Sequence, residues 1–175
     1  MNPDYFSYMA DCSYEADVRI GDARLTLEAL GPNSQDLIVI DAFSSDSIPT
    51  HLLTSEALSL YRSKLKENGL IFFHTSNRVM DVASVVVRLA QDAGLESRFI
   101  SKSDFSDKKY GEFHMVSSGM LIGKSAPLLA ATQGKADWKI LRPSPNVKAW
   151  SDDYSSIIAS LKSHAYKEAS VEAAP

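Results

Sequence analysis

The sequence predicts an α/β fold with a doubly wound, mostly parallel sheet and an antiparallel C-terminal edge. Residues 37–40 form an unbroken apolar run, which is typical of a strand covered by helices on both faces. Strand-like and helix-like segments then alternate along the chain as far as residue 101. The last two strand-like segments have no helix between them, which predicts an antiparallel pair.

The elements before the central run are short. Residues 3–12 are expected to form a helix, because their apolar residues recur at helical spacing. A brief strand is predicted over 17–21, followed by a helix that has Asp22 as its N-cap and ends at Gly31-Pro32. The central strand is predicted over 36–41, so that its last residue is Asp41.

The second half of the chain is predicted to continue the alternation. A helix capped by Thr54 and closed by Asn68-Gly69 is expected first, followed by a buried strand over 70–75 and a helix from 78 to Ala93 that Gly94 ends. A strand over 97–101, a charged loop over 102–112 and a strand over 113–124 with a bulge at Gly119 come next. The last expected segments are a surface linker over 126–137, an extended loop over 138–145 and a helix over 155–163. Residues 1–163 are therefore predicted to form one domain, and residues 164–175 a flexible tail.

Composition favours a globular protein in a reducing compartment. The 175 residues are 45% apolar and 23% charged, and the net charge is −4. No stripe of Lys and Arg points to nucleic acid, and no apolar run approaches the ~18 residues of a membrane span. The single cysteine, Cys12, cannot form an internal disulfide, so the cytoplasm is the expected location.

Two acidic residues flank the loop that follows the central strand. Asp41 stands at the strand's carboxyl end, where open α/β sheets bind ligands, and Asp46 lies five residues further on. Such a pair can hold a cationic ligand, and one carboxylate can take a proton from it. The alternatives are that Asp41 binds amides of its own turn and that Asp46 belongs to an ordinary polar loop.

Other polar residues have simpler interpretations. His74, near the end of a predicted strand, is interpreted as a hydrogen-bonded core histidine. The remaining histidines have no Cys, His or acidic neighbour at metal-ligand spacing, so no metal is predicted. The serines of the loop after Asp41 lack a G-x-S-x-G elbow, which argues against a hydrolase.

Four motifs together resemble one family. They are GDAR at 21–24, DAFSSDSIP at 41–49, HTSNR at 74–78 and WSDDY at 150–154. In this order they are similar to the spermidine synthase-like family, over nearly the whole chain from Tyr5 to about Leu161. The resemblance is closest to the soluble domain of fused, membrane-attached members.

The resemblance implies a fold, a reaction and roles for four residues. The fold is the Rossmann-like fold of class I S-adenosylmethionine-dependent methyltransferases. The reaction is transfer of an aminopropyl group from decarboxylated S-adenosylmethionine to a polyamine acceptor, a small cationic amine. By this resemblance Asp22 and Ala23 hold the adenine, Asp41 is the base that accepts the amine proton, and Asp46 grips the substrate ammonium.

This sequence departs from the family pattern in three respects. Asp41 and Asp46 have four residues between them, where the polyamine synthases have two, and the loop lacks a glycine before Pro49. No glycine-rich turn precedes the first predicted strand. The chain is therefore expected to lack the first two strands of the fold, which would lie between the strands ending at Gly21 and Asp41. An open edge there predicts a homo-oligomer or a completing chain.

Three functions remain open from the sequence. The first is an aminopropyltransferase domain, which is expected to be active only if it binds nucleoside without the glycine-rich turn. The second is a non-catalytic remnant or interaction module of the same fold. The third is a methyltransferase that uses S-adenosylmethionine.

Overall fold

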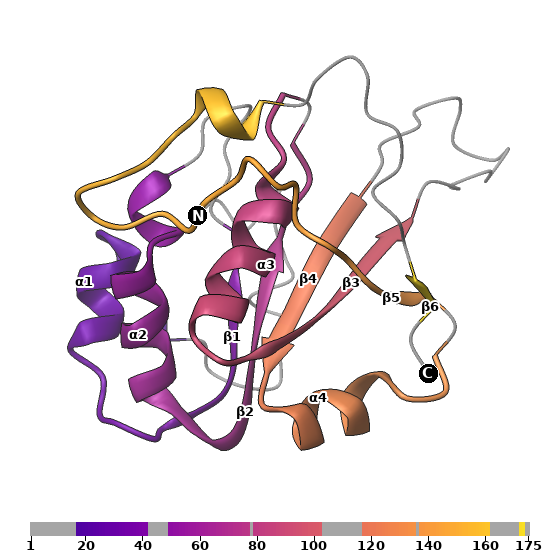
Figure 1. Ribbon diagram of the computed structural model, residues 1–175. Helices are drawn as coiled ribbons and strands as arrows, with labels where there is room; N and C mark the ends of the chain where they lie inside the picture. The colour runs from indigo at the N-terminus through magenta and orange to yellow at the C-terminus, as the bar shows by residue number, and fades with distance from the viewer. Residues whose placement is uncertain are drawn as a thin grey trace, which may run out of the picture.

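The computed structural model describes residues 17–41, 49–77, 79–102, 117–135 and 137–161, together with the backbone of residues 172–173. These residues form a mixed α/β unit around a six-stranded sheet (Figure 1). In chain order the elements are α1 (Ala23–Glu28), β1 (Gln35–Ile40), η1 (Thr50–Leu52), α2 (Ser55–Lys64), β2 (Leu65–His74), α3 (Val82–Asp92), β3 (Glu96–Lys102), β4 (Ser117–Gly123), α4 (Ser125–Thr132), β5 (Trp138–Ile140), η2 (Ile158–Ser160) and β6 (Glu172–Ala173).

The strand order of the sheet is β1-β2-β4-β3-β5-β6. β1 and β2 are parallel, whereas β4 lies between β2 and β3 and is antiparallel to both. It follows that β1, β2 and β3 all point the same way. β5 and β6 continue the sheet with antiparallel pairing. The predicted α/β class with an antiparallel C-terminal side is therefore confirmed.

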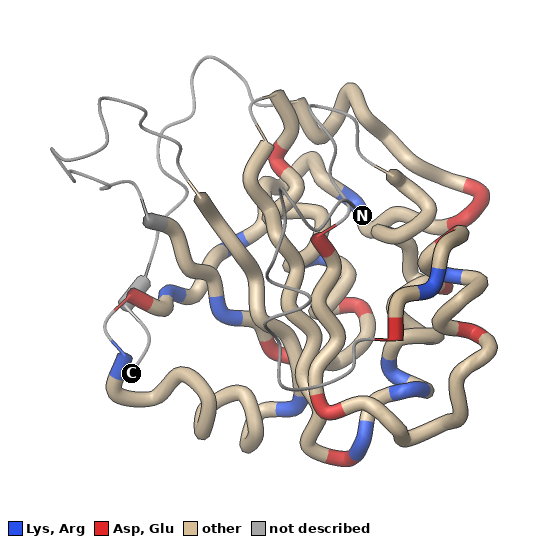
Figure 2. The backbone as a smooth tube through the Cα atoms, turned by 180° about the vertical axis from the view of Figure 1, so that it is seen from behind, with Lys and Arg blue, Asp and Glu red and all other residues tan. Residues whose placement is uncertain are grey.

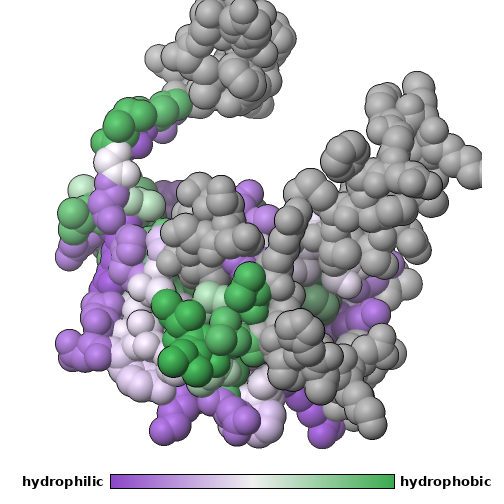
Figure 3. All heavy atoms as spheres, turned by 90° about the horizontal axis from the view of Figure 1, so that it is seen from above, coloured by the Kyte–Doolittle hydropathy of each residue, from purple (hydrophilic) through white to green (hydrophobic). Residues whose placement is uncertain are grey.

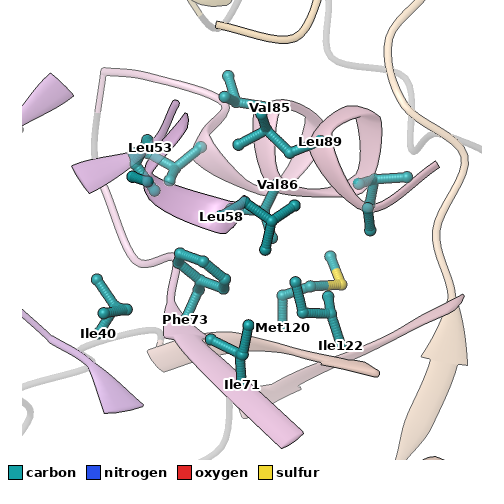
Figure 4. Close-up of a cluster of buried hydrophobic side chains, with 14 of the residues drawn as sticks. Ile40, Leu53, Leu58, Ile71, Phe73, Val85, Val86, Leu89, Met120 and Ile122 are labelled. Carbon is teal, nitrogen blue, oxygen red and sulfur yellow. The ribbon is translucent and has the colours of Figure 1, made fainter. Parts of the chain in front are cut away.

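One hydrophobic core fills the space between the sheet and the helices α2 and α3. Figure 4 shows apolar side chains of α3 pointing at Phe73 and its neighbours on the sheet. β4 contributes Met120 and Ile122 to this core, and the buried Leu121 between them projects to the opposite face because strand residues alternate. In the described part of the chain, fewer helices pack against the opposite face of the sheet. α4 is one of them, and its Leu128 is fully buried.

The helix starts follow from capping residues that the sequence displays. Asp22 caps α1 by accepting hydrogen bonds from the amides of Arg24 and Leu25, and Thr54 caps α2 through the amide of Ala57. α3 is closed by Gly94 with φ of 68°, as predicted. It begins at Val82 rather than 78, because Asn77 Oδ1 accepts from the amides of residues 79 and 80 and forms a turn first.

β1 is not the doubly covered central strand that its sequence predicted. It is the end strand of the described sheet, and only Ile38 and Ile40 are buried. Leu37 and Val39 project to the other face and are 51% and 55% exposed. An apolar run indicates that a strand would be stable when both of its faces are buried. Whether the faces are buried depends on which helices and strands pack against them. The described residues supply no strand or helix for this edge and face.

The strand predicted over 17–21 is also wrong. Residues 17–20 form no strand, and Val18 and Ile20 are 62% and 95% exposed. A strand is stable only when neighbouring strands satisfy its backbone groups. Alternation of apolar residues along one segment does not place a second strand beside it.

Three further expectations on local structure are corrected. Asn68-Gly69 does not close a helix but lies within β2, where the pairing register with β1 shifts between Gln35 and Leu37. Gly119 marks no bulge; its missing side chain makes room for the ring of Phe72, since a Cβ would lie 2.2 Å from the Phe72 Cζ atom. The predicted linker over 126–137 contains α4.

Over residues 155–161, the described part of the final helix predicted for 155–163, no α-helix forms and the short turn η2 is present instead. Its apolar residues are largely exposed, with Ile158 at 83%. Figure 3 shows green, apolar side chains gathered on the upper surface of the molecule, the side on which η2 lies in Figure 1. The exposed large apolar residues of this region are Val79, Ile157, Ile158 and Leu161.

Several expectations lie outside the described residues. They are the helix over 3–12, Asp46, most of the loop over 102–112, the start of the strand over 113–124 and most of the tail from residue 164. Within the described ranges, no helix is long and apolar enough to cross a membrane. Figure 2 shows acidic and basic positions interspersed along the backbone of this part.

Candidate active site at the carboxyl edge of the sheet

The pairing register of β1 and β2 brings two polar residues together. Ile40 pairs with Phe73 in parallel, so the residues that follow them, Asp41 and His74, emerge side by side at the same edge. His74 Nδ1 lies 2.8 Å from Asp41 Oδ1. The predicted candidate Asp41 therefore has a partner that the sequence analysis had interpreted as a core residue.

Hydrogen bonds extend this pair toward β4. His74 Nε2 lies 2.7 Å from Ser76 Oγ, and the Ser118 amide donates to the same hydroxyl at 2.7 Å. Thr75 lies opposite Ser118, with its amide on the Ser118 carbonyl at 2.9 Å and its hydroxyl 3.0 Å from the Ser118 hydroxyl. These contacts link residues at or just beyond the ends of β1 and β2 to Ser118 of β4.

The exposed member of this chain of side chains is Asp41. Its side chain is 62% exposed, compared with 29% for His74. Among the described residues, the His74 imidazole contacts the Asp41 carboxylate. Residues 42–48 of the turn after Asp41 lie outside the described residues, so the alternative that Asp41 binds amides of this turn stays a prediction. Asp41 thus lies at the carboxyl edge of the sheet, where open α/β sheets bind ligands, and one of its carboxylate oxygens faces the His74 imidazole.

Asp22 and Ala23 lie at the start of α1, and both are exposed. Asp22 Oδ1 caps the helix, and Asp22 Oδ2 lies 3.2 Å from His51 Nε2. The amide of Leu25, then that of Arg24 and the nearby imidazole, hold the pKa of Asp22 below its usual value. Both interpretations of Asp22, as a helix cap and as an acceptor for a ligand, are compatible with this geometry.

The WSDDY motif at 150–154 is not followed directly by a helix, since the next element is the short turn η2 at Ile158–Ser160. Instead Asp152 forms a bidentate ion pair with Arg24, in which both nitrogen–oxygen distances are 2.7 Å. Thr54 also donates to Asp152, at 2.8 Å, and the Arg24 guanidinium together with this hydroxyl lowers the pKa of Asp152 to about 2. Asp152 therefore ties the GDAR motif to the start of α2.

We expect Asp152→Asn to change the acid stability of the protein. The folded pKa of about 2 lies below the unfolded value of about 3.9, so the pair stabilises the fold above pH 4 and this contribution is lost as pH falls toward 2. The unfolding free energy of Asp152→Asn should be lower than that of the wild type at pH 6 and should fall less steeply between pH 4 and 2. Urea unfolding at a series of pH values measures this, with Asp153→Asn as the control. Parallel pH dependence in Asp152→Asn and the wild type would contradict the assignment.

A cavity and a search for metal ligands add no residue to the site. A cavity of about 290 Å³ lies between α2 and α3 and is lined by Leu58, Arg62 and Leu89 among others. It contains none of the predicted site residues, so we assign it no part in the chemistry. The described residues also hold no group of three or more His, Cys, Asp and Glu side chains that could bind a metal ion.

His74 as the partner of Asp41, Ser76 as the partner of His74 and Asp152 as the partner of Arg24 were not predicted from the sequence. A signal for His74 was available, since two successive parallel strands that each end in a polar residue place those residues at one edge. No comparable signal exists for Arg24 and Asp152, which are 128 residues apart in the chain. Asp46 lies outside the described residues, so its place relative to Asp41 stays a prediction.

Comparisons with known proteins identify related sequences and folds. No family model matches the chain. A polyamine aminopropyltransferase of Vibrio vulnificus is 32% identical over 80 residues, which are 43% of this chain and 27% of that protein. A probable spermidine synthase from Corynebacterium glutamicum superposes with a TM-score of 0.54 at 18% identity, over 83% of this chain and 57% of the other. A spermidine synthase from Thermotoga maritima gives 0.48 at 16% identity, over 84% of this chain and 47% of the other, a likeness too low to support an argument.

The matched regions are parts of longer proteins, because the chain covers just over half of the Corynebacterium structure and about a quarter of the Vibrio sequence. The sequence match and the fold nevertheless agree with each other and with the motifs at 21–24, 41–49, 74–78 and 150–154. The chain resembles the spermidine synthase-like family in both its sequence and its fold.

Proposed function

We propose that this chain is a spermidine synthase-like transferase domain, which moves an aminopropyl group from decarboxylated S-adenosylmethionine to a small cationic amine. The observation that supports this best is the Asp41 carboxylate, exposed at the carboxyl edge of the sheet and oriented by His74. An ammonium group is not a nucleophile, so the acceptor must lose a proton before it attacks. Asp41 is proposed to accept that proton.

The remaining predicted roles follow from the same proposal. The nucleoside co-substrate brings its own reactive sulfonium, and the protein supplies binding and alignment. Asp22 and Ala23 are proposed to hold the adenine, since the Asp22 side chain is 39% exposed and can accept from an exocyclic amine while it caps α1. Asp46 is proposed to bind the distal ammonium of the acceptor.

Calorimetric titration with three nucleosides tests the proposal. We expect decarboxylated S-adenosylmethionine and methylthioadenosine to bind, because both carry the adenosine and thioether parts of the proposed substrate. Binding and turnover of S-adenosylmethionine alone would instead support a methyltransferase. Absence of binding by all three at high micromolar concentration would support a non-catalytic domain.

The open edge of β1 favours a second candidate, an interaction module that pairs with a second copy of the chain. Unprotected edge strands pair with other strands, and β1 presents exposed Leu37 and Val39 beside its free edge in the described part of the sheet. In an antiparallel pair centred on Ile38, Leu37 of one copy lies across from Val39 of the other. The patch is therefore self-complementary, as a two-fold interface requires.

We expect the wild-type protein to elute from gel filtration as a dimer at high concentration and to dissociate on dilution. Val39→Lys should raise the apparent dissociation constant of the dimer by about tenfold or more, because it places a charge at the interface between the two copies. Ile20→Lys is the matched control, since Ile20 is 95% exposed and lies outside the sheet. A monomer at all concentrations would rule out this mode of association.

A further inference from the structure

Two contacts of His74, with Asp41 and with Ser76, favour one arrangement of its ring protons. An ionised carboxylate only accepts hydrogen bonds, so the 2.8 Å contact with Asp41 requires a proton on His74 Nδ1. The Ser118 amide already donates to Ser76 Oγ, so the Ser76 hydroxyl must direct its own proton elsewhere. His74 Nε2 at 2.7 Å is a better acceptor than the Ser118 carbonyl at 3.4 Å. The favoured order is therefore Ser76 O–H to Nε2, and Nδ1–H to Asp41.

This connectivity is that of a Ser-His-Asp triad, but the surroundings differ in two respects. The Ser118 amide points at the Ser76 hydroxyl itself and not at the position of a developing oxyanion. Ser76 is also partly buried between His74 and β4, whereas Asp41 is the most exposed of the three hydrogen-bonded side chains. Ser76 therefore anchors the imidazole, and the group presented to a substrate is the carboxylate.

We infer that His74 is a positioning residue for Asp41, with Ser76 and the Ser118 amide fixing the imidazole from behind. The inference rests on the proposed function. In that reaction an N–H proton of the acceptor passes to Asp41 Oδ2, and the nitrogen electron pair forms a bond to the carbon next to the sulfonium. The carbon–sulfur bond breaks with its electron pair moving to sulfur, which leaves a neutral thioether. Throughout, His74 Nδ1–H holds Asp41 Oδ1 and so keeps Oδ2 directed at the amine.

Three variants of His74 separate positioning from general structural support. Asn places an amide N–H near the position of Nδ1, Gln places one near Nε2, and Ala provides neither. We expect His74→Ala to lower kcat by about 100-fold, the effect of a misplaced catalytic group, without changing the KM for the nucleoside. His74→Asn should recover most of this loss, and His74→Gln should not. Equal loss in His74→Asn and His74→Ala, with unchanged thermal unfolding midpoints, would overturn the inference.

A spectroscopic measurement decides the inference independently of activity. Two-bond ¹⁵N–¹H correlation spectra of the wild type should show the Nδ1–H tautomer of His74. In Asp41→Asn the amide can also donate, so the population should shift toward Nε2–H. The Nε2–H tautomer in the wild type, or no change in the variant, would overturn the role of His74. A wild type with the expected tautomer but no transfer would instead overturn the proposed function alone.

Discussion

Replacement of Asp41 by Asn is expected to abolish measurable transfer while the nucleoside still binds. The variant keeps the size and shape of the side chain but cannot accept the amine proton. Loss of a general base costs about 100- to 10,000-fold in rate. Because Asp41 follows β1, and Asp22 and Ala23 begin α1, the affinity for decarboxylated S-adenosylmethionine should stay within about threefold of the wild type.

Asp36→Asn is the matched control for this experiment. Asp36 is a carboxylate at the opposite end of β1, with a side chain that is 80% exposed and paired with Lys66 at 2.7 Å. Its replacement removes the same charge from the same strand without touching the carboxyl edge. Retained turnover in Asp41→Asn, or equal loss in both variants, would remove Asp41 from the role of base.

Replacement of Phe73 by Ala is expected to cause the largest loss of stability. Phe73 is 1% exposed and lies at the centre of the core between β2 and the helices, with the Tyr61 ring centroid 6.3 Å away (Figure 4). Removing a buried phenyl group costs about 3–5 kcal/mol, which is a large part of the stability of a domain of this size. Urea unfolding monitored by circular dichroism gives the value.

Phe73→Leu provides the comparison, because it retains most of the apolar volume and should cost less than Phe73→Ala. Phe72→Ala is a second control, because Phe72 directly precedes Phe73 in β2, projects to the opposite face of the sheet and is only partly buried. A loss for Phe73→Ala below that for Phe72→Ala would contradict the core as described.

Elements whose signals are local could be predicted from the sequence. Asp22 and Thr54 cap their helices through amides two or three residues away, and Gly94 ends α3 by its own backbone conformation. The strand β1 was predicted for the same reason, since an apolar run is a property of the strand itself. Its exposure was not predictable, because covering depends on other segments of the chain. The helix predicted over 155–163 failed because apolar spacing does not ensure a face to pack against.

The same distinction holds for the candidate site. Asp41 could be chosen as a candidate because it ends its own predicted strand, and its side chain is 62% exposed. His74 required the pairing register of β1 and β2, which one sequence does not specify. The ion pair between Arg24 and Asp152 depends on the return of the chain to α1 after 128 residues, which only the fold reveals.

Release of methylthioadenosine is the most direct test of the central claim, that an oriented carboxylate at the tip of β1 activates a cationic amine. The protein is mixed with decarboxylated S-adenosylmethionine in the presence and absence of putrescine, and both products are quantified. We expect methylthioadenosine and spermidine to form in equal amounts, only when putrescine is present, and neither product to form with Asp41→Asn. Release of methylthioadenosine without the amine, or no release at saturating concentrations of both substrates, would contradict it.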